Sequence, residues 1–301
     1  MLVSGFTIIR NGVKFDFPFL ESIQSALPVC DEFVVNIGVS EDSTKKVLED
    51  FRAALPQAEA AKLKFFDSQW PVDSAEKRKG GQILADQTNL ALSQCQGTWC
   101  LYLQADEVLH EEDHAKLRSQ LEQYSKNTKI EGVVLNYVHF YGTYNVIQTS
   151  RSAYRREVRI IRNRIGVQSI GDAQGFRHDD GRKLNAVVSR ASVYHYGWVR
   201  PQEVMKAKTA FMDTLYHPEA TVDLPATGNN YLYKRIVGLR PFTGSHPKFM
   251  QARVEGSPRF DFSKVPKVFH WKDTWKVLSG WIEQITGVRL FEYKNYRRIR
   301  L

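Results

Sequence analysis

The sequence predicts an α/β protein built on a mixed, mostly parallel sheet with helices on both faces. Over the first 130 residues, short apolar runs alternate with segments of helical period, which is typical of a sheet whose parallel strands are joined by helices. Most of the apolar runs are continuous rather than alternating, as in strands buried on both faces. After residue 130 two apolar runs follow each other with no helical segment between them, which indicates antiparallel additions to the sheet.

Four apolar runs are the expected strands of the first half, at residues 6–9, 32–37, 63–66 and 99–103. The segments between them place apolar residues three and four positions apart, which predicts amphipathic helices. These helices are expected at residues 17–27, 44–55 and 75–94, and Leu117 and Leu121 mark another after the fourth strand.

The second half is less regular. Strands are expected at 132–140 and 158–161, loops at 141–156 and 163–186, and a helix at 201–216. Residues 271–301 carry apolar side chains at helical spacing and then a basic tail; the apolar set is Trp271, Trp275, Leu278, Trp281, Ile282 and Ile285. This stripe either packs on the core or lies on an anionic membrane surface. We expect one main domain over residues 1–200 and a helical, aromatic-rich C-terminal extension over 201–301.

The chain has 301 residues, 43% of them hydrophobic, which is enough for a sizeable core. Its net charge of +9 favours anionic partners such as sugar nucleotides, acidic membrane surfaces or nucleic acid. Cys30, Cys95 and Cys100 have no metal-type spacing and are expected to be buried thiols of a reducing compartment. The start MLVSGFTIIRNG is too short and becomes polar too soon for a signal peptide, so we expect none, and no apolar run is long enough for a membrane span. We therefore expect a cytoplasmic protein, with peripheral contact at the inner membrane face through the C-terminal basic helix.

The most informative segment is WCLYLQADE, residues 99–107, in which an apolar run stops at Asp106 and Glu107. A buried parallel strand that ends in this way places its carboxylates at the carboxyl edge of an open sheet. Carboxylates there can bind a divalent cation, which can bind a diphosphate. The alternative is that both acids cap the helix that follows.

Several segments, in this order, resemble a family 2 glycosyltransferase with the GT-A (Rossmann-like) fold. They are FTIIRNG, FVVNIGVSEDST, ILADQTNLAL, GTWCLYLQADE, VRIIRN and YHYGW, and the similarity spans roughly residues 3–200. The resemblance implies inverting transfer of a sugar from a nucleotide-diphosphate-sugar donor to a saccharide or lipid-linked saccharide acceptor. It also implies Mn²⁺ or Mg²⁺ on the diphosphate and a role in the assembly of a bacterial surface polysaccharide, with the extension shaping the acceptor side.

This chain departs from the family's Asp-X-Asp motif, because Gln104 and Ala105 precede Asp106. In the family the last carboxylate is the usual metal ligand, so the resemblance implies that Asp106 binds the metal, with His195 of YHYGW as a second ligand. Gln104 can still accept a hydrogen bond from a ribose hydroxyl or offer a carbonyl oxygen, but without charge. His195 is otherwise a structural member of an aromatic cluster with its neighbours.

The resemblance also implies a nucleotide-binding set at the strand ends and beside the helix that precedes the acidic strand. This set comprises Thr7, Arg10, Asn11, Asn36, Asp42, Lys79, Asn89, Gln104 and Ala105. Asp42 is equally a plain helix cap. The Gly pair after Lys79 would let the backbone approach a diphosphate, or it begins a flexible loop.

Inverting transfer needs a general base near the acceptor hydroxyl, and a carboxylate is the usual choice. The segment SIGDAQGFRHDDGR offers Asp172, Asp179 and Asp180. We prefer Asp172 as the base, with Asp180 as the second candidate. Asp179 and Asp180 precede a glycine and are also a good turn signal.

Other functions compete with glycosyl transfer. The glutamine at position 104 allows a catalytically weak or inactive GT-A-like binding protein. A nucleotidyltransferase would carry a Gly-rich loop after the first strand, and RNGVK is a poor one. A basic nucleic-acid-binding protein fits the charge, but no motif supports it and the acidic strand end would repel phosphates, so we expect no nucleic acid. A run of arginines at residues 151–164 suits a diphosphate, an anionic acceptor or simply solvent.

Overall fold

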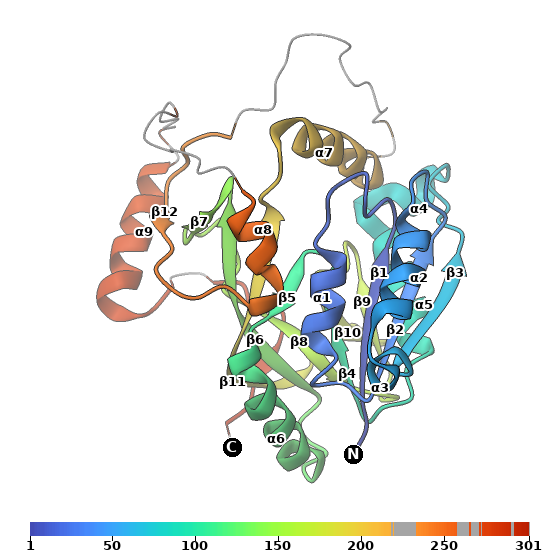
Figure 1. Ribbon diagram of the computed structural model, residues 1–301. Helices are drawn as coiled ribbons and strands as arrows, with labels where there is room; N and C mark the ends of the chain where they lie inside the picture. The colour runs from blue at the N-terminus through green and yellow to red at the C-terminus, as the bar shows by residue number, and fades with distance from the viewer. Residues whose placement is uncertain are drawn as a thin grey trace.

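The structure is a computed structural model that describes residues 1–217, 219, 233–257, 265, 271, 273–289 and 292–300. Its centre is one large mixed sheet with the strand order β12-β7-β6-β8-β4-β1-β2-β3, and β11, β5 and β13 extend it from β6. Helices cover both faces of this sheet (Figure 1). The predicted α/β class, with a mixed and mostly parallel sheet, is confirmed.

The four strands predicted for the first half are present and form the parallel part of the sheet. They are β1 (Val3–Ile9), β2 (Glu32–Gly38), β3 (Leu63–Ser68) and β4 (Trp99–Tyr102). The chain places β2 and β3 on one side of β1 and then returns to place β4 on the other side. The direction of winding therefore reverses between β1 and β4. In open α/β sheets, the crevice at the carboxyl ends of the strands at such a reversal is where ligands bind.

Two apolar clusters fill the two faces of the sheet. Val3 and Ile9 of β1 face α1 (Phe19–Ala26), α2 (Thr44–Ala54) and α6 (His114–Ser125). Phe6 and Ile8 join the other cluster, with Ala91 and Leu92 of α5 (Gln82–Ser93). This division follows from the alternation of side chains along a strand. All seven residues of β1 are buried, Ser4 and Thr7 included, because the strand lies between the two clusters.

The second half adds antiparallel strands, as the sequence predicts. These are β6 (Gly132–Tyr141), which pairs with β8 (Arg156–Arg162), while β8 also pairs with β4. The long strand β11 (Asn185–Trp198) runs parallel to β6 and antiparallel to β5 (Glu107–Leu109).

Two segments expected to be loops contain strands. Within residues 141–156, β7 (Thr143–Gln148) returns beside β6 through Gly142, whose φ of +70° permits the tight turn. Within residues 163–186, β9 (Val167–Ile170) and β10 (Gly175–His178) form a separate two-stranded sheet. These strands are short and carry few apolar residues, so they form no recognisable apolar run.

The helix predicted at 75–94 is broken. It consists of α4 (Ala75–Arg78), the 3₁₀ turn η1 (Lys79–Gly81) and α5. Gly80 and Gly81 have φ values of +64° and +77°, a left-handed conformation that ends a right-handed helix. The break lets the chain change direction beside the ends of the strands.

The described parts of residues 201–301 join the same sheet and its surroundings. The expected helices are α7 (Gln202–Tyr216) and α9 (Asp273–Thr286). The strand β12 (Leu239–Pro241) pairs with β7, and β13 (Arg297–Arg298) pairs with β11. The remaining short helical elements are α3 (Gln57–Ala60), η2 (Glu111–Asp113), η3 (Lys248–Met250) and α8 (Gln251–Glu255). Residues on both sides of the expected boundary at residue 200 therefore contribute strands to the same sheet.

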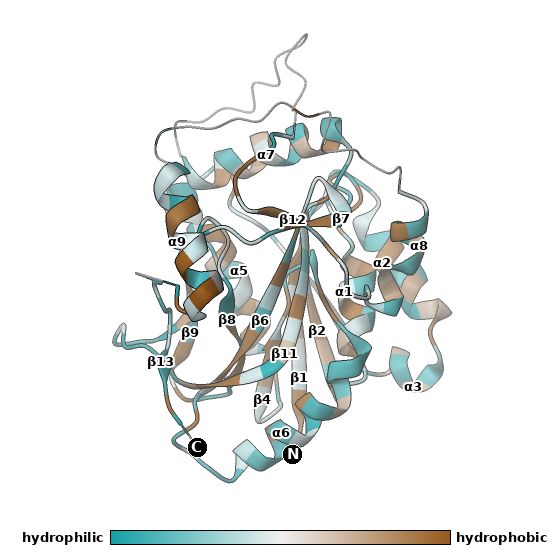
Figure 2. Cartoon of the chain, turned by 90° about the vertical axis from the view of Figure 1, so that its left-hand side faces the viewer, coloured by the Kyte–Doolittle hydropathy of each residue, from teal (hydrophilic) through white to brown (hydrophobic). Residues whose placement is uncertain are grey.

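The tryptophan stripe of α9 faces outward. Trp275, Trp281 and Ile285 are 52%, 64% and 67% exposed, whereas Asp273 and Ser279 on the same helix are buried. Figure 2 shows hydrophobic residues along α9 at the edge of the molecule. The stripe therefore does not pack on the described core, and contact with a membrane surface stays a prediction. Within the described ranges, none of the helices has the length and apolarity needed to span a bilayer.

We expect Gly5→Ala to destabilise the protein. A Cβ at Gly5 would lie 2.2 Å from Phe33 Cδ2 and 2.9 Å from Cys30 Sγ, and overpacking of this kind costs about 1–3 kcal/mol. The measurement is chemical denaturation followed by circular dichroism. Gly280→Ala in α9 is the matched control, because nothing lies within 4 Å of a Cβ there. Equal stability of the two variants would contradict this account of the β1–β2 contact.

Candidate active site

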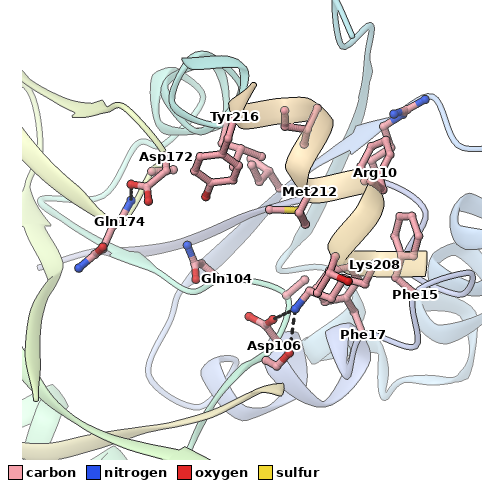
Figure 3. Close-up of a pocket in the computed structure, with 18 of the residues that line it drawn as sticks. Arg10, Phe15, Phe17, Gln104, Asp106, Asp172, Gln174, Lys208, Met212 and Tyr216 are labelled. Atoms are coloured by element: carbon pink, nitrogen blue, oxygen red, sulfur yellow. Dashed lines mark hydrogen bonds and ion pairs between the residues drawn. The ribbon is translucent and has the colours of Figure 1, made fainter. Parts of the chain in front are cut away.

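A cavity of about 480 Å³ lies at the carboxyl ends of β1 and β4, where the direction of winding reverses. Arg10 lines it after β1, and Gln104, Ala105 and Asp106 line it after β4. The helix α7 crosses above these strand ends (Figure 1) and covers the cavity. Figure 3 shows Lys208 of this helix pointing at Asp106.

A buried ion pair between Glu107 and Arg159 fixes both walls of this cavity. Both side chains are fully buried, and Arg159 Nε and Nη2 donate to the Glu107 carboxylate at 2.9 and 2.8 Å. The same carboxylate accepts hydrogen bonds from the Tyr137 hydroxyl at 2.7 Å and the Gln104 backbone N–H at 3.0 Å. Arg159 Nη1 donates to the carbonyl of Gln174 at 2.7 Å, on the opposite wall. Glu107 therefore has a structural role. Its carboxylate is taken up by these contacts and neither caps a helix nor binds a ligand.

Asp106 faces three potentially cationic side chains. Its carboxylate lies 3.2 Å from Lys208 Nζ, 3.6 Å from Arg200 Nη2 and 3.6 Å from His195 Nε2. Burial raises the pKa of Asp106, but Lys208, His195 and Arg200 lower it by more, so its net pKa lies below the ordinary value. Asp106 is therefore ionised at neutral pH.

Of the two cations Lys208 and Arg200 beside Asp106, Lys208 is the one that lines the cavity. Its ammonium group also donates to the carbonyl of Gly197 at 2.9 Å and lies 4.9 Å from the centre of the Phe17 ring. Burial lowers the pKa of Lys208 to about 8, and Arg200 acts in the same direction while Asp106 opposes both. Arg200 lies behind this contact, where its guanidinium donates to Phe15 O and Gly197 O.

His195 is held in one tautomer by a second histidine. His139 Nε2 lies 2.7 Å from the carbonyl of Tyr154, which can only accept, so that nitrogen carries the proton. His139 Nδ1 then accepts from His195 Nδ1 at 3.0 Å. Burial lowers the pKa of His139 to about 3, so that ring is neutral. Burial also lowers the pKa of His195, while Asp106 and Glu107 act in the opposite direction.

Asp172 lies on the wall opposite Lys208, beside Tyr216 of α7 (Figure 3). Its Oδ1 accepts the backbone N–H of Gln174 at 3.2 Å. Gly81 approaches it closely, because a Cβ there would lie 3.0 Å from the Asp172 Cα. The broken helix thus brings a bare backbone against this wall, which the predicted continuous helix would not do.

The remaining lining is largely apolar and aromatic, and includes Trp70, Leu84 and Tyr102. Arg10 lies 5.3 Å from the centre of the Phe211 ring, and its Nε donates to the carbonyl of Val39. Among the described residues, its buried Nη1 has no hydrogen-bond partner. An anion in the cavity could supply one.

Of the residues predicted for the site, Arg10, Gln104, Ala105, Asp106, Asp172 and His195 come together around this cavity. The other predicted residues do not line it. Thr7 and Asn36 are buried inside β1 and β2, and Asn36 Nδ2 donates to the carbonyl and side chain of Gln87. Asn11 Oδ1 accepts from the Glu41 backbone, and Asp42 accepts from Thr44 and Lys14 at the start of α2.

Three further predicted residues also lie elsewhere. Lys79 is exposed in η1. Asn89 makes two hydrogen bonds to the backbone of Ser169 at 2.7 and 2.9 Å, so it joins α5 to β9 rather than supporting the acidic strand end. Asp180 is exposed and accepts the backbone N–H of Arg182, which is the turn role that its sequence also indicates.

The site combines features for and against a divalent metal. His195 Nε2 lies 3.6 Å from the Asp106 carboxylate, and the bare Gly197 leaves space there, since a Cβ would lie 2.6 Å from that nitrogen. However, two buried cations already face this single carboxylate, and affinity for divalent cations depends on ligand charge. The part of the chain that the structure describes contains no group of three His, Cys, Asp or Glu side chains able to hold a metal. These residues fit Mn²⁺ or Mg²⁺ poorly, and no step below passes through a metal.

Sequence reasoning missed Lys208, Arg200 and Tyr216. One signal was available: Lys208 lies three residues after Met205 and four before Met212, on the apolar side of a helix. A lysine there is unusual unless its charge has a buried partner. That partner, Asp106, is 102 residues away in the sequence.

Comparisons with known proteins give only distant matches. No protein-family model matches the chain, and no curated protein matches it either. Among solved structures it is similar to S. aureus TarS in complex with UDP-GlcNAc, at 22% identity over 46% of this chain and 35% of that chain, with a TM-score of 0.31. Another TarS structure matches at 18% identity over 68% and 38%, with a TM-score of 0.38. TarS in complex with UDP matches at 14% over 71% and 65%, with a TM-score of 0.36. This chain thus spans less than two thirds of each of them, and at such scores the likeness assigns it no function.

We expect Glu107→Gln to destabilise the protein strongly, because it leaves the Arg159 charge buried without its counter-ion. Breaking a buried pair in this way costs about 3–5 kcal/mol. The measurement is the free energy of unfolding from urea denaturation. Asp50→Asn is the control, since the exposed Lys46–Asp50 pair is worth less than about 1 kcal/mol. If both variants unfold at the same urea concentration, Glu107 and Arg159 do not carry the role described.

Proposed function

We propose that this chain is a glycosyltransferase that moves a sugar from a nucleotide-diphosphate-sugar donor to a saccharide or lipid-linked saccharide acceptor. One observation carries the proposal. The cavity lies at the winding reversal between β1 and β4, with cations on one wall and the Asp172 carboxylate on the opposite wall. Nucleotides bind at such reversals in open α/β sheets.

The cavity suits a nucleotide-sugar donor in size and lining. The cavity volume of about 480 Å³ is that of a small-molecule site. Trp70, Leu84 and Tyr102 offer apolar surface, and Arg10 and Lys208 offer positive charge for phosphate oxygens. Gln104 replaces a family carboxylate with an uncharged group that can bind a hydroxyl.

In the proposed reaction, an acceptor hydroxyl oxygen attacks the anomeric carbon as the bond from that carbon to the diphosphate oxygen breaks. Asp172 accepts the hydroxyl proton as general base. A single displacement of this kind inverts the anomeric configuration. Mn²⁺ or Mg²⁺ would neutralise the diphosphate in enzymes that use it, but the charges at Asp106 do not favour that here.

We place the acceptor in a second cavity, of about 610 Å³, between β6, β7 and α9. Tyr154 lines both cavities. The second cavity is lined by one carboxylate, Glu283, and by more cations: Arg155, Arg156, Arg240, Lys276 and Arg289. An acceptor with negative charge suits this lining. It is shaped in part by the C-terminal extension, as the resemblance implies. A cytoplasmic location with peripheral membrane contact, and a role in polysaccharide assembly, belong to the same proposal.

The proposal is tested by a thermal-shift screen of UDP-, GDP-, CMP- and dTDP-sugars, followed by an assay of nucleotide release with the donor that stabilises the protein. Stabilisation by one donor class is the expected result. Stabilisation by none of them would sink the proposal.

We expect Asp172→Asn to lower the rate of transfer about 10²–10⁴-fold, the usual contribution of a general base, while the donor still raises the melting temperature. Asp180→Asn is the matched control and should transfer at the normal rate, because Asp180 lies in an exposed turn. Undiminished transfer by the Asp172 variant would assign the base to another group.

A further inference from the structure

We propose that Lys208 is the cation that binds the donor diphosphate and neutralises it as it leaves, in the place where related enzymes use a divalent metal. This inference rests on the proposed function and names the group that performs one part of it. The resemblance implies a metal at Asp106, but the cations that surround Asp106 fit a metal poorly, and the inference starts from this difference.

The contacts of Lys208 leave it able to bind an anion. An ammonium group has three N–H donors, and the contacts to Asp106 Oδ2 and Gly197 O use two of them. The side chain lines the cavity, so the third donor is available to a phosphate oxygen there. Hydrogen bonds between charged partners are the strong ones.

The surrounding charges favour an anion and oppose a second cation. Lys208 and Arg200 lie 3.2 and 3.6 Å from the single carboxylate of Asp106, so positive charge is in excess here, with two cations against one carboxylate. Arg200 Nη2 is buried and has no hydrogen-bond partner within the described residues. A diphosphate would reduce this excess, whereas a divalent metal would increase it.

The position of Lys208 is fixed from both ends. Asp106 is held by the Glu107–Arg159 pair through the turn that begins at Gln104. Lys208 belongs to α7, whose Met205, Met212 and Tyr216 line the same cavity. Asp106 thus orients the ammonium group toward the donor, which makes Asp106 a positioning residue rather than a metal ligand.

The chemical step balances without a further reactant. As the acceptor oxygen bonds to the anomeric carbon, the electron pair of the breaking bond stays on the terminal oxygen of the diphosphate. The hydroxyl proton passes to Asp172. Lys208 remains protonated and donates a hydrogen bond to the oxygen that gains charge, which is the stabilisation expected of a preorganised cation at a leaving group.

The test compares a nucleoside diphosphate with its nucleoside. Binding of UDP and uridine, or of the pair whose base the donor screen selects, is measured by calorimetry on full-length protein in EDTA and again in Mn²⁺. We expect the diphosphate to bind equally in both buffers. We expect Lys208→Met to weaken its binding about tenfold or more, with the nucleoside unaffected, and Lys208→Arg to restore most of it. Lys206→Met, on the same helix but outside the cavity lining, is the matched control and should bind like the wild type.

The outcomes separate this inference from the proposed function. Diphosphate binding that requires Mn²⁺ would overturn the role of Lys208 and leave a nucleotide-sugar enzyme. Equal loss of nucleoside and diphosphate binding in Lys208→Met would also overturn it, because it would show that Lys208 only holds α7 in place. Failure of every nucleotide to bind the wild type would instead reject the proposed function.

Discussion

The ion pair between Glu107 and Arg159 is the interaction on which the cavity depends. It joins the turn after β4 to β8, and through the Gln174 carbonyl it reaches the opposite wall. Two charges with no solvent exposure are stable only when each is paired and hydrogen-bonded, and here Tyr137 and backbone groups complete the set. Asp106 and Asp172 therefore hold their positions through one buried contact, although neither residue takes part in it.

The two adjacent acids Asp106 and Glu107 therefore have different roles. Asp106 and Glu107 are neighbours at the end of an apolar run, and the sequence does not distinguish them. In the structure Glu107 turns into the protein as the first residue of β5, where it lies opposite His195 of β11. Asp106 turns into the cavity. The pairing of β5 with β11 also explains why His195 lies beside Asp106.

The sheet was predictable because several of its strands contain short apolar runs, as in Glu32–Gly38 and Trp99–Tyr102, separated by segments of helical period. Two features were not predictable, because neither depends on a long apolar pattern. They are the helix break at Gly80 and Gly81 and the small sheet of β9 and β10. The site was predictable where a residue follows directly from a strand end, as for Gln104 and Asp106. The site was not predictable where polar side chains form hydrogen bonds inside the protein. Asn36 binds Gln87, and Asn89 binds the backbone of Ser169. Lys208 could not be assigned, because its partner is set by the tertiary fold. Membership of family 2 stays a prediction.

Tyr154 is a lining residue of both the first and the second cavity. It lies 4.8 Å from Tyr137 and 4.6 Å from His139, edge-on to both rings, so it is held in place by aromatic neighbours rather than by the backbone alone. A substitution of Tyr154 would therefore change the lining of both cavities at once.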